Sequence, residues 1–171
     1  MNKISFLVLF LLMFTINYAQ EKEPNPEVVT TYYLIRHAEK DLSNPANRNP
    51  NLSDIGVQRA KNWTKILKNA SFDAVYSTDY NRTKQTAKPI SESNNLETVI
   101  YDLRGFDFEK FKSKTKGKII MIVGHSNTTP LFVNTFIGYQ KYQQIKESNY
   151  SNIYIITIIG NTISDKLLTI N

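Results

Sequence analysis

Two apolar stretches that each run directly into a histidine constrain this chain more than any other feature. The first, Val28 to Ile35, is rich in β-branched and aromatic residues and is followed by Arg36-His37-Ala38-Glu39. The second, Ile119 to Val123, is followed by Gly124-His125-Ser126. Both have the form of a buried β-strand, and open α/β sheets bind ligands where such strands end. These two histidines, the only ones in the chain, therefore mark a candidate binding edge.

Strand-like and helical patterns alternate along the rest of the chain. Ser53 can cap a helix that begins near Asp54. Thr78 or Asp79 can begin a second helix, which Pro89 is expected to bend or end early. The other expected elements are strands over 72–77 and 97–101, a short helix over 106–111, a helix over 128–137 closed by glycine, and a hairpin whose strands 153–159 and 162–170 flank a Gly-Asn pair. This order predicts an α/β fold with a mainly parallel sheet, helices on both faces and a C-terminal antiparallel hairpin.

The first 20 residues have the form of a secretory signal peptide. Lys3 supplies a positive start, the apolar core from Ile4 to Phe14 is 11 residues long, and Ala19 offers a small residue for cleavage. Spanning a bilayer takes roughly 20 apolar residues, so no stable membrane anchor is expected, although a retained N-terminal anchor is the alternative. We expect an exported protein, periplasmic or secreted, in which residues 21–171 form a single domain.

The charge of the chain favours small anionic ligands. Without the signal peptide, 20 Lys and Arg stand against 15 Asp and Glu. The densest basic run, Lys110 to Lys118, flanks a predicted turn and is interpreted as a solvated face rather than a nucleic-acid site. A weakly positive field attracts small anions. The sequence indicates neither a nucleic-acid partner nor an oligomeric state.

Four basic side chains are expected to meet at one edge of the sheet. Arg36 and His37, Arg82, and His125 follow the first, second and fourth predicted strands. Arginine suits phosphate oxygens, a neutral imidazole can attack phosphorus, and neighbouring cations favour the neutral form. The second imidazole, if protonated, can stabilise developing negative charge. Two alternatives remain: a metal site with Glu39 as third ligand, which the arginines disfavour, and two histidines buried for structural reasons.

Four segments, in order, resemble the histidine phosphatase superfamily, which has the phosphoglycerate mutase-like fold. Arg36-His37-Ala38-Glu39 is similar to its Arg-His-Gly signature, and Gly124-His125-Ser126 to its Gly-His-Ser/Gly signature. The stretches from Asn51 to Ala60 and from Tyr76 to Ala87 resemble the two segments between these signatures. Together the four segments cover most of the chain after the signal peptide, and the small phosphohistidine phosphatases are the most similar branch.

The resemblance implies a fold and a set of roles. The fold is a three-layer α/β/α sandwich. His37 would be the nucleophile that becomes phosphorylated, and Arg36, Arg82 and His125 would bind the phosphoryl group. Asn127 is placed to reach the same pocket. The implied enzyme is metal-independent and needs no organic cofactor.

The departures from the family pattern concern the proton donor. Ala38 replaces a glycine, which keeps the side chain small. Gly105 stands where many members carry the glutamate that protonates the leaving group, and Ser126 stands where another branch carries an aspartate. Asp102 and Glu39 are the candidates that remain for this role. A missing general acid costs about 10²–10⁴ in rate with a poor leaving group.

Three functions are compatible with these residues. The first is a phosphatase that hydrolyses small phosphomonoesters or phosphoramidates through a phosphohistidine on His37. The second is a non-catalytic phosphate- or anion-binding protein of the same fold, which the missing glutamate would explain. The third is a phosphoglycerate-type mutase. The loop from Asp41 to Pro50 is expected to shape the pocket wall, and the sequence does not indicate the substrate.

Overall fold

The computed structural model of the protein describes residues 27–170. The predicted signal peptide lies outside these residues, and its boundary stays a prediction. The elements, in chain order, are β1 (Val29–Arg36), α2 (Asp54–Ile66), β2 (Ala74–Ser77), α3 (Asn81–Ser93), β3 (Thr98–Ile100), α4 (Phe108–Lys114), β4 (Ile119–Gly124), α5 (Thr128–Ile137), β5 (Asn152–Ile159) and β6 (Thr162–Thr169). None of the helices formed by residues 27–170 has the length and apolar character that crossing a membrane requires.

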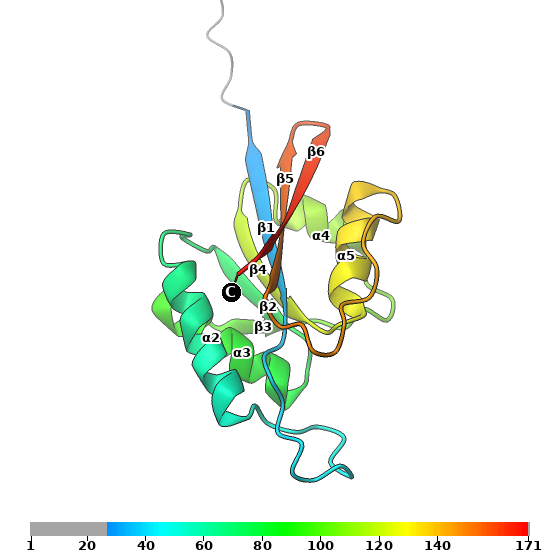
Figure 1. The fold of residues 1–171 in the computed structure, drawn as a ribbon. Helices are drawn as coiled ribbons and strands as arrows, with labels where there is room; N and C mark the ends of the chain where they lie inside the picture. Colours follow the sequence, from blue (N-terminus) through cyan, green and yellow to red (C-terminus); the bar gives the residue numbers. More distant parts are fainter. Residues whose placement is uncertain (1–26, 171) are drawn as a thin grey trace, which may run out of the picture.

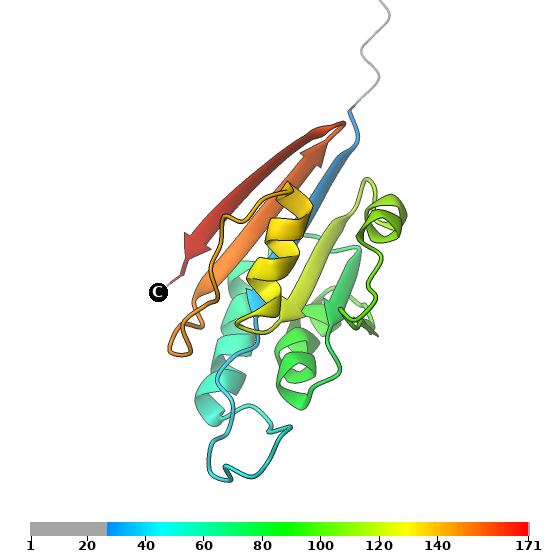
Figure 2. The same cartoon turned by 90° about the vertical axis from the view of Figure 1, so that its right-hand side faces the viewer.

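The strands form one sheet in the order β3-β2-β4-β1-β5-β6. The first four of these run parallel to one another, whereas β5 pairs antiparallel with β1 and with β6. Helices α2 and α3 cover one face and α4 and α5 the other (Figures 1 and 2). The predicted three-layer α/β/α sandwich with a mainly parallel sheet and a C-terminal hairpin is confirmed.

Alternation along β1 explains why two cores form. Tyr32 and Leu34 point into a cluster with the aromatic side chains of α4 and α5. Tyr33 and Ile35 point the other way, into a cluster with Trp63 of α2 and residues of α3. Successive side chains of a strand face opposite sides, so the four consecutive apolar or aromatic residues 32–35 of β1 require cover on both faces. Strand β1 thus holds the middle of the sandwich together.

Helix α3 does not end early at Pro89, one of the two outcomes predicted for this proline. The helix continues past it to Ser93. Ala87 and Ile90 pack in the core beside it, which offsets the roughly 3 kcal/mol cost of an internal proline. The side chain of Asn94 also donates to the carbonyl of Ile90 and satisfies the last turn. The helix begins at Asn81, later than predicted, and leaves Thr78 and its neighbours in the loop.

The register of the sheet brings the functional segments together. The last residue of β1, Arg36, pairs with Gly124 at the end of β4, and Ser77 at the end of β2 pairs with Val123. The residues that follow these strands therefore emerge at one carboxyl edge. The long loop after β1 also projects beyond this edge (Figure 1). Residues 138–151, between α5 and β5, form neither a helix nor a strand.

Candidate active site

The four basic side chains predicted to converge do lie at this edge. The rings of His37 and His125 have centroids 5.4 Å apart. Nη2 of Arg82 lies 3.4 Å from Nδ1 of His125. Both histidines and both arginines line a single cavity of about 980 Å³. Residues from three strand ends thus form one basic pocket. Both histidines line a cavity, so the alternative that they are core residues buried for structural reasons is wrong.

His37 is held in one orientation with one nitrogen free. Its Nδ1 lies 2.7 Å from the carbonyl oxygen of Ala38. A carbonyl only accepts, so Nδ1 carries the hydrogen and Nε2 keeps its lone pair. Burial is the largest cause that lowers the pKa of His37, to about 3; the Ala38 hydrogen bond opposes it, and the nearby His125, Arg36 and Arg82 add to it. At neutral pH this imidazole is an uncharged nucleophile.

His125 has the opposite tautomer. A guanidinium only donates, so Nδ1 of His125 accepts from Arg82 and Nε2 carries the hydrogen. That Nε2 lies 2.9 Å from the hydroxyl of Thr78, to which it donates. Burial, followed by the charges of Arg82 and Arg36, lowers the pKa of His125 to about 4. The charges around His125 are cationic, so this imidazole is neutral when only the protein's own groups surround it. Its expected role in stabilising negative charge therefore depends on protonation when an anion binds.

Arg82 is the guanidinium with hydrogen-bonding capacity to spare. Its Nε and Nη1 are buried and find no acceptor among residues 27–170. Its flat face packs on the ring of Tyr80, with Cζ 4.5 Å from the ring centroid. Buried donors without acceptors are costly, and a phosphoryl oxygen would satisfy them. Arg82 is thus positioned as an anion receptor, as predicted.

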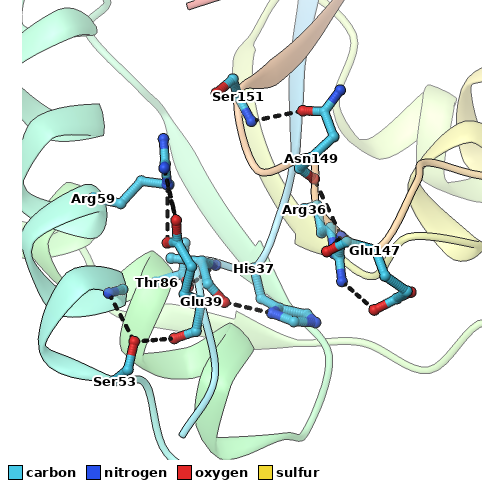
Figure 3. A network of polar contacts seen from close by, with 11 residues as sticks. Arg36, His37, Glu39, Ser53, Arg59, Thr86, Glu147, Asn149 and Ser151 are labelled. Atoms are coloured by element: carbon cyan, nitrogen blue, oxygen red, sulfur yellow. Dashed lines mark hydrogen bonds and ion pairs between the residues drawn. The ribbon is translucent and has the colours of Figure 1, made fainter. Parts of the chain in front are cut away.

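Arg36 is largely occupied by the loop between α5 and β5. Its Nη1 donates to the carbonyl oxygens of Lys146, Glu147 and Asn149 at 3.0 to 3.1 Å. Its Nη2 forms a 2.6 Å ion pair with the carboxylate of Glu147 (Figure 3). Tyr150 covers its other face, 4.3 Å away. Arg36 lines the cavity, as predicted, but only its Nε has no partner among the described residues.

Glu39 does not reach the pocket. Its carboxylate accepts three hydrogen bonds from Arg59 of α2, at 2.6 to 2.9 Å. In Figure 3 it points away from the ring of His37. Burial raises the pKa of Glu39, but the hydrogen bonds from Arg59, a backbone hydrogen bond and the charges of Arg59 and Arg36 together lower it overall. The expectation that Glu39 could donate the proton is wrong, because Arg59 holds it, and the metal alternative lacks the third ligand that it required.

Asp102 and Asn127 line the cavity as predicted. The carboxylate of Asp102 pairs with Arg104 at 2.6 Å, and both side chains are largely exposed. The hydrogen bonds from Arg104 lower the pKa of Asp102. Asn127 precedes the first turn of α5, and its side chain makes no capping hydrogen bond. Asp102 is thus part of the pocket wall, at a position open to solvent.

Four residues around the pocket were not predicted from the sequence to belong to it. Thr78 and Tyr80 hold the His125 half of the site. Glu147 and Tyr150 hold the Arg36 half, and they lie in the polar stretch for which no structure was predicted. The position of Thr78 at the end of a strand was a usable hint. Glu147 gave none, because its place depends on contacts with residues more than 100 positions earlier.

The fold is shared with solved phosphatases of low sequence identity. A phosphoserine phosphatase variant from Entamoeba histolytica, in complex with phosphoserine, has a TM-score of 0.63 at 14% identity and covers 80% of this chain and 95% of its own. The candidate phosphohistidine phosphatase SixA from Agrobacterium tumefaciens has a TM-score of 0.57 at 18% identity, over 82% of this chain and 99% of its own. These likenesses establish the fold.

Sequence comparison is more specific. Phosphoserine phosphatase 1 from Hydrogenobacter thermophilus is 38% identical over 74 residues, which are 40% of this chain and 35% of that protein. The match thus spans about a third of the length of this relative. Residues 32–123 match the model of the histidine phosphatase superfamily (branch 1), which is more than half of the chain. Both arginines, His37 and the long loop lie within that range, and we conclude that the chain belongs to the histidine phosphatase superfamily.

Proposed function

We propose that this protein is a phosphatase that transfers a phosphoryl group to His37 and then to water. One observation carries the proposal: a neutral imidazole nitrogen and buried guanidinium donors line the same cavity. His37 presents an uncharged Nε2 to the pocket. In the same cavity, Arg82 presents two buried donors for which residues 27–170 supply no acceptor. A nucleophile beside an anion receptor is the pairing that phosphoryl transfer requires.

The residues divide the reaction between them. Nε2 of His37 forms a bond to phosphorus as the bond to the leaving group breaks. Arg82 and Nε of Arg36 donate to the phosphoryl oxygens and balance their charge. An incoming dianion raises the pKa of His125, which then takes up a proton and donates to the same oxygens. Water attacks the phosphohistidine in the second step and releases phosphate.

Small phosphomonoesters and phosphoramidates are the proposed substrates. The relatives support this class, since the matched curated protein is named a phosphoserine phosphatase and one structural neighbour binds phosphoserine. A second neighbour carries the name of a phosphohistidine phosphatase. The cavity is large enough for a small organic phosphate, since ligand pockets are typically about 300–1,000 Å³.

A non-catalytic anion-binding protein is the second candidate. One specific observation favours it: Gly105 occupies the place of the family's usual glutamate, and the Arg36 guanidinium is already paired with Glu147. Such a protein would bind phosphate without forming a phosphoenzyme. The mutase is not supported by a particular contact and stays a hypothesis.

Substitution of the nucleophile separates these candidates. We expect His37→Ala to lower hydrolysis of p-nitrophenyl phosphate by at least about 10⁴-fold and to abolish an acid-quenched phosphoenzyme. Arg59→Ala, which changes a residue on α2 that contacts Glu39 but does not line the cavity, is the control and should retain a phosphoenzyme. Full activity in His37→Ala would exclude the assigned nucleophile. Phosphate binding by the wild type without any phosphoenzyme would establish the second candidate.

We also propose that the protein is exported and cleaved after residue 19 or 20. The short apolar core from Ile4 to Phe14 and the small residue at 19 support this. Mass spectrometry of the protein recovered from the periplasm or medium of an expressing bacterium should show a chain that begins near residue 20. A full-length chain in the membrane fraction would instead identify the apolar segment as a retained anchor.

A further inference from the structure

The cavity contains three carboxylates that could replace the family's missing proton donor. They are Asp79, Asp102 and Glu147. Asp79 pairs with Lys84 at 2.7 Å and Asp102 with Arg104 at 2.6 Å, and in each pair both partners are largely exposed. These two carboxylates therefore form ion pairs with exposed basic side chains at the wall of the cavity. Only the third contacts the residues that carry the chemistry.

Glu147 joins the two halves of the site. Its Oε2 accepts from Nη2 of Arg36 at 2.6 Å, and its Oε1 accepts from the hydroxyl of Ser126 at 2.8 Å. Arg36 directly precedes His37, and Ser126 directly follows His125. One carboxylate therefore bridges the neighbours of both histidines. Figure 3 shows the side chain of Glu147 next to that of Arg36.

The backbone around Glu147 is fastened to the same edge. Nη1 of Arg36 donates hydrogen bonds to the carbonyl oxygens of residues 146, 147 and 149. The amide of Ile145 donates to the carbonyl of Ser126 at 2.9 Å. The guanidinium is almost fully buried, whereas 66% of the Glu147 side chain is exposed. The carboxylate is thus anchored at its base and accessible at its tip, which suits a group that exchanges protons with substrate and water.

We propose that Glu147 is the acid and base of the reaction, an inference that rests on the phosphatase function proposed above. In the first step, Nε2 of His37 bonds to phosphorus, the bond from phosphorus to the leaving oxygen or nitrogen breaks, and that atom takes the proton of Glu147. In the second step, the Glu147 carboxylate takes a proton from water as the water oxygen bonds to phosphorus. The phosphorus–nitrogen bond breaks, its electron pair returns to His37, and phosphate leaves with Glu147 protonated again.

Substrate binding itself prepares Glu147 for this role. In the protein alone, hydrogen bonds from Ser126 and Arg36 lower the pKa of Glu147, and its carboxylate is ionised at neutral pH. A phosphoryl group that binds Nε of Arg36 shares the positive charge of the guanidinium with Glu147 and adds negative charge next to it. A cationic partner whose charge is partly neutralised and a new anionic neighbour both raise the pKa of a carboxyl group. The proton therefore arrives with the phosphoryl group and is available for the leaving atom.

The dependence on leaving group tests the proposal. An acid matters when the leaving group is a poor one and little when it is a stable anion. We expect Glu147→Gln to lower kcat/KM for β-glycerophosphate by about 10²–10⁴-fold and for 2,4-dinitrophenyl phosphate by less than about tenfold. Glu147→Asp, which keeps a carboxyl group, should recover part of the lost activity. Asp79→Asn, which removes the same charge from another part of the wall, should leave the ratio of the two substrates unchanged.

Three results would overturn the proposal. Equal losses for both substrates in Glu147→Gln, with a lowered melting temperature, would show that Glu147 only anchors the loop. A gain with both substrates would show that the carboxylate blocks the phosphoryl site. A substrate-selective loss in Asp102→Asn, but not in Glu147→Gln, would assign the acid to Asp102. If the wild type hydrolyses neither substrate and forms no phosphoenzyme, the phosphatase function itself fails.

Discussion

The pocket contains two arginine–histidine pairs that look alike and are built differently. In each pair a tyrosine packs on the guanidinium, Tyr150 on Arg36 and Tyr80 on Arg82. Arg36 is followed directly by its histidine, His37, and both come from the end of β1. Arg82 lies in α3 and meets a histidine that follows β4. One pair is therefore local in sequence, and the other exists only in the folded chain.

The two arginine–histidine pairs differ in their hydrogen bonds, and this difference gives them different chemical roles. The guanidinium of Arg36 is hydrogen-bonded to the loop between α5 and β5 and to Glu147. In the first pair, His37 is therefore the side chain that can react with a substrate. In the second pair the imidazole is hydrogen-bonded to Thr78 and Arg82, and two donors of the guanidinium have no acceptor in the described part of the chain. The first pair thus supplies a nucleophile and the second a receptor for the anion. Similar residues at similar strand ends acquire different chemistry through the groups that contact them.

Removing the imidazole of the second pair is the strongest test of this division. We expect His125→Ala to lower kcat by about 10²–10³-fold, because it removes a donor to the phosphoryl oxygens and a contact that orients Arg82. The phosphoenzyme on His37 should still form, only more slowly. Rapid-quench measurement of phosphoenzyme with p-nitrophenyl phosphate gives the rate.

Complete loss of phosphoenzyme in His125→Ala would contradict the comparison. Such a result would mean that the second imidazole takes part in bond formation rather than in charge stabilisation. The same experiment on His37→Ala supplies the reference, because that variant should form no phosphoenzyme at all.

A helix glycine beneath the first pair offers a smaller test. A Cβ on Gly56 of α2 would lie 2.1 Å from the carbonyl oxygen of Glu39, which is two residues beyond His37. In an open helix, replacing glycine with alanine is stabilising by up to about 1 kcal/mol. Here the backbone contact should reverse the sign, and we expect Gly56→Ala to destabilise the protein by about 1–3 kcal/mol.

Urea unfolding measures this effect, and Lys61→Ala on the exposed face of α2 is a matched control. The control should change the free energy of unfolding by less than about 0.5 kcal/mol. An increase in stability in Gly56→Ala would show that the segment after His37 is free to move away from the helix. The first pair would then be less rigidly positioned than its contacts indicate.

Much of the scaffold could be predicted because its signals are local. The apolar runs of β1 and β4 indicate buried strands, Ser53 caps α2 as expected, and Gly138 closes α5 in the left-handed conformation. Strand ends in a parallel sheet share an edge, so Arg36, His37, Arg82 and His125 could be assigned to one pocket. The length of α3 could not be predicted from the sequence, because buried contacts beside Pro89 outweigh the local effect of the proline.

The amino-acid sequence by itself determined the sandwich and the four basic residues of the pocket, because periodicity and strand-end position are properties of neighbouring residues. Only the tertiary structure decided which histidine nitrogen is free, that Arg59 withdraws Glu39 from the site, and that Glu147 enters it. Each of these depends on a hydrogen bond between groups that the chain separates or on the direction of one side chain. Such contacts have no period in the sequence and follow from packing the elements against one another.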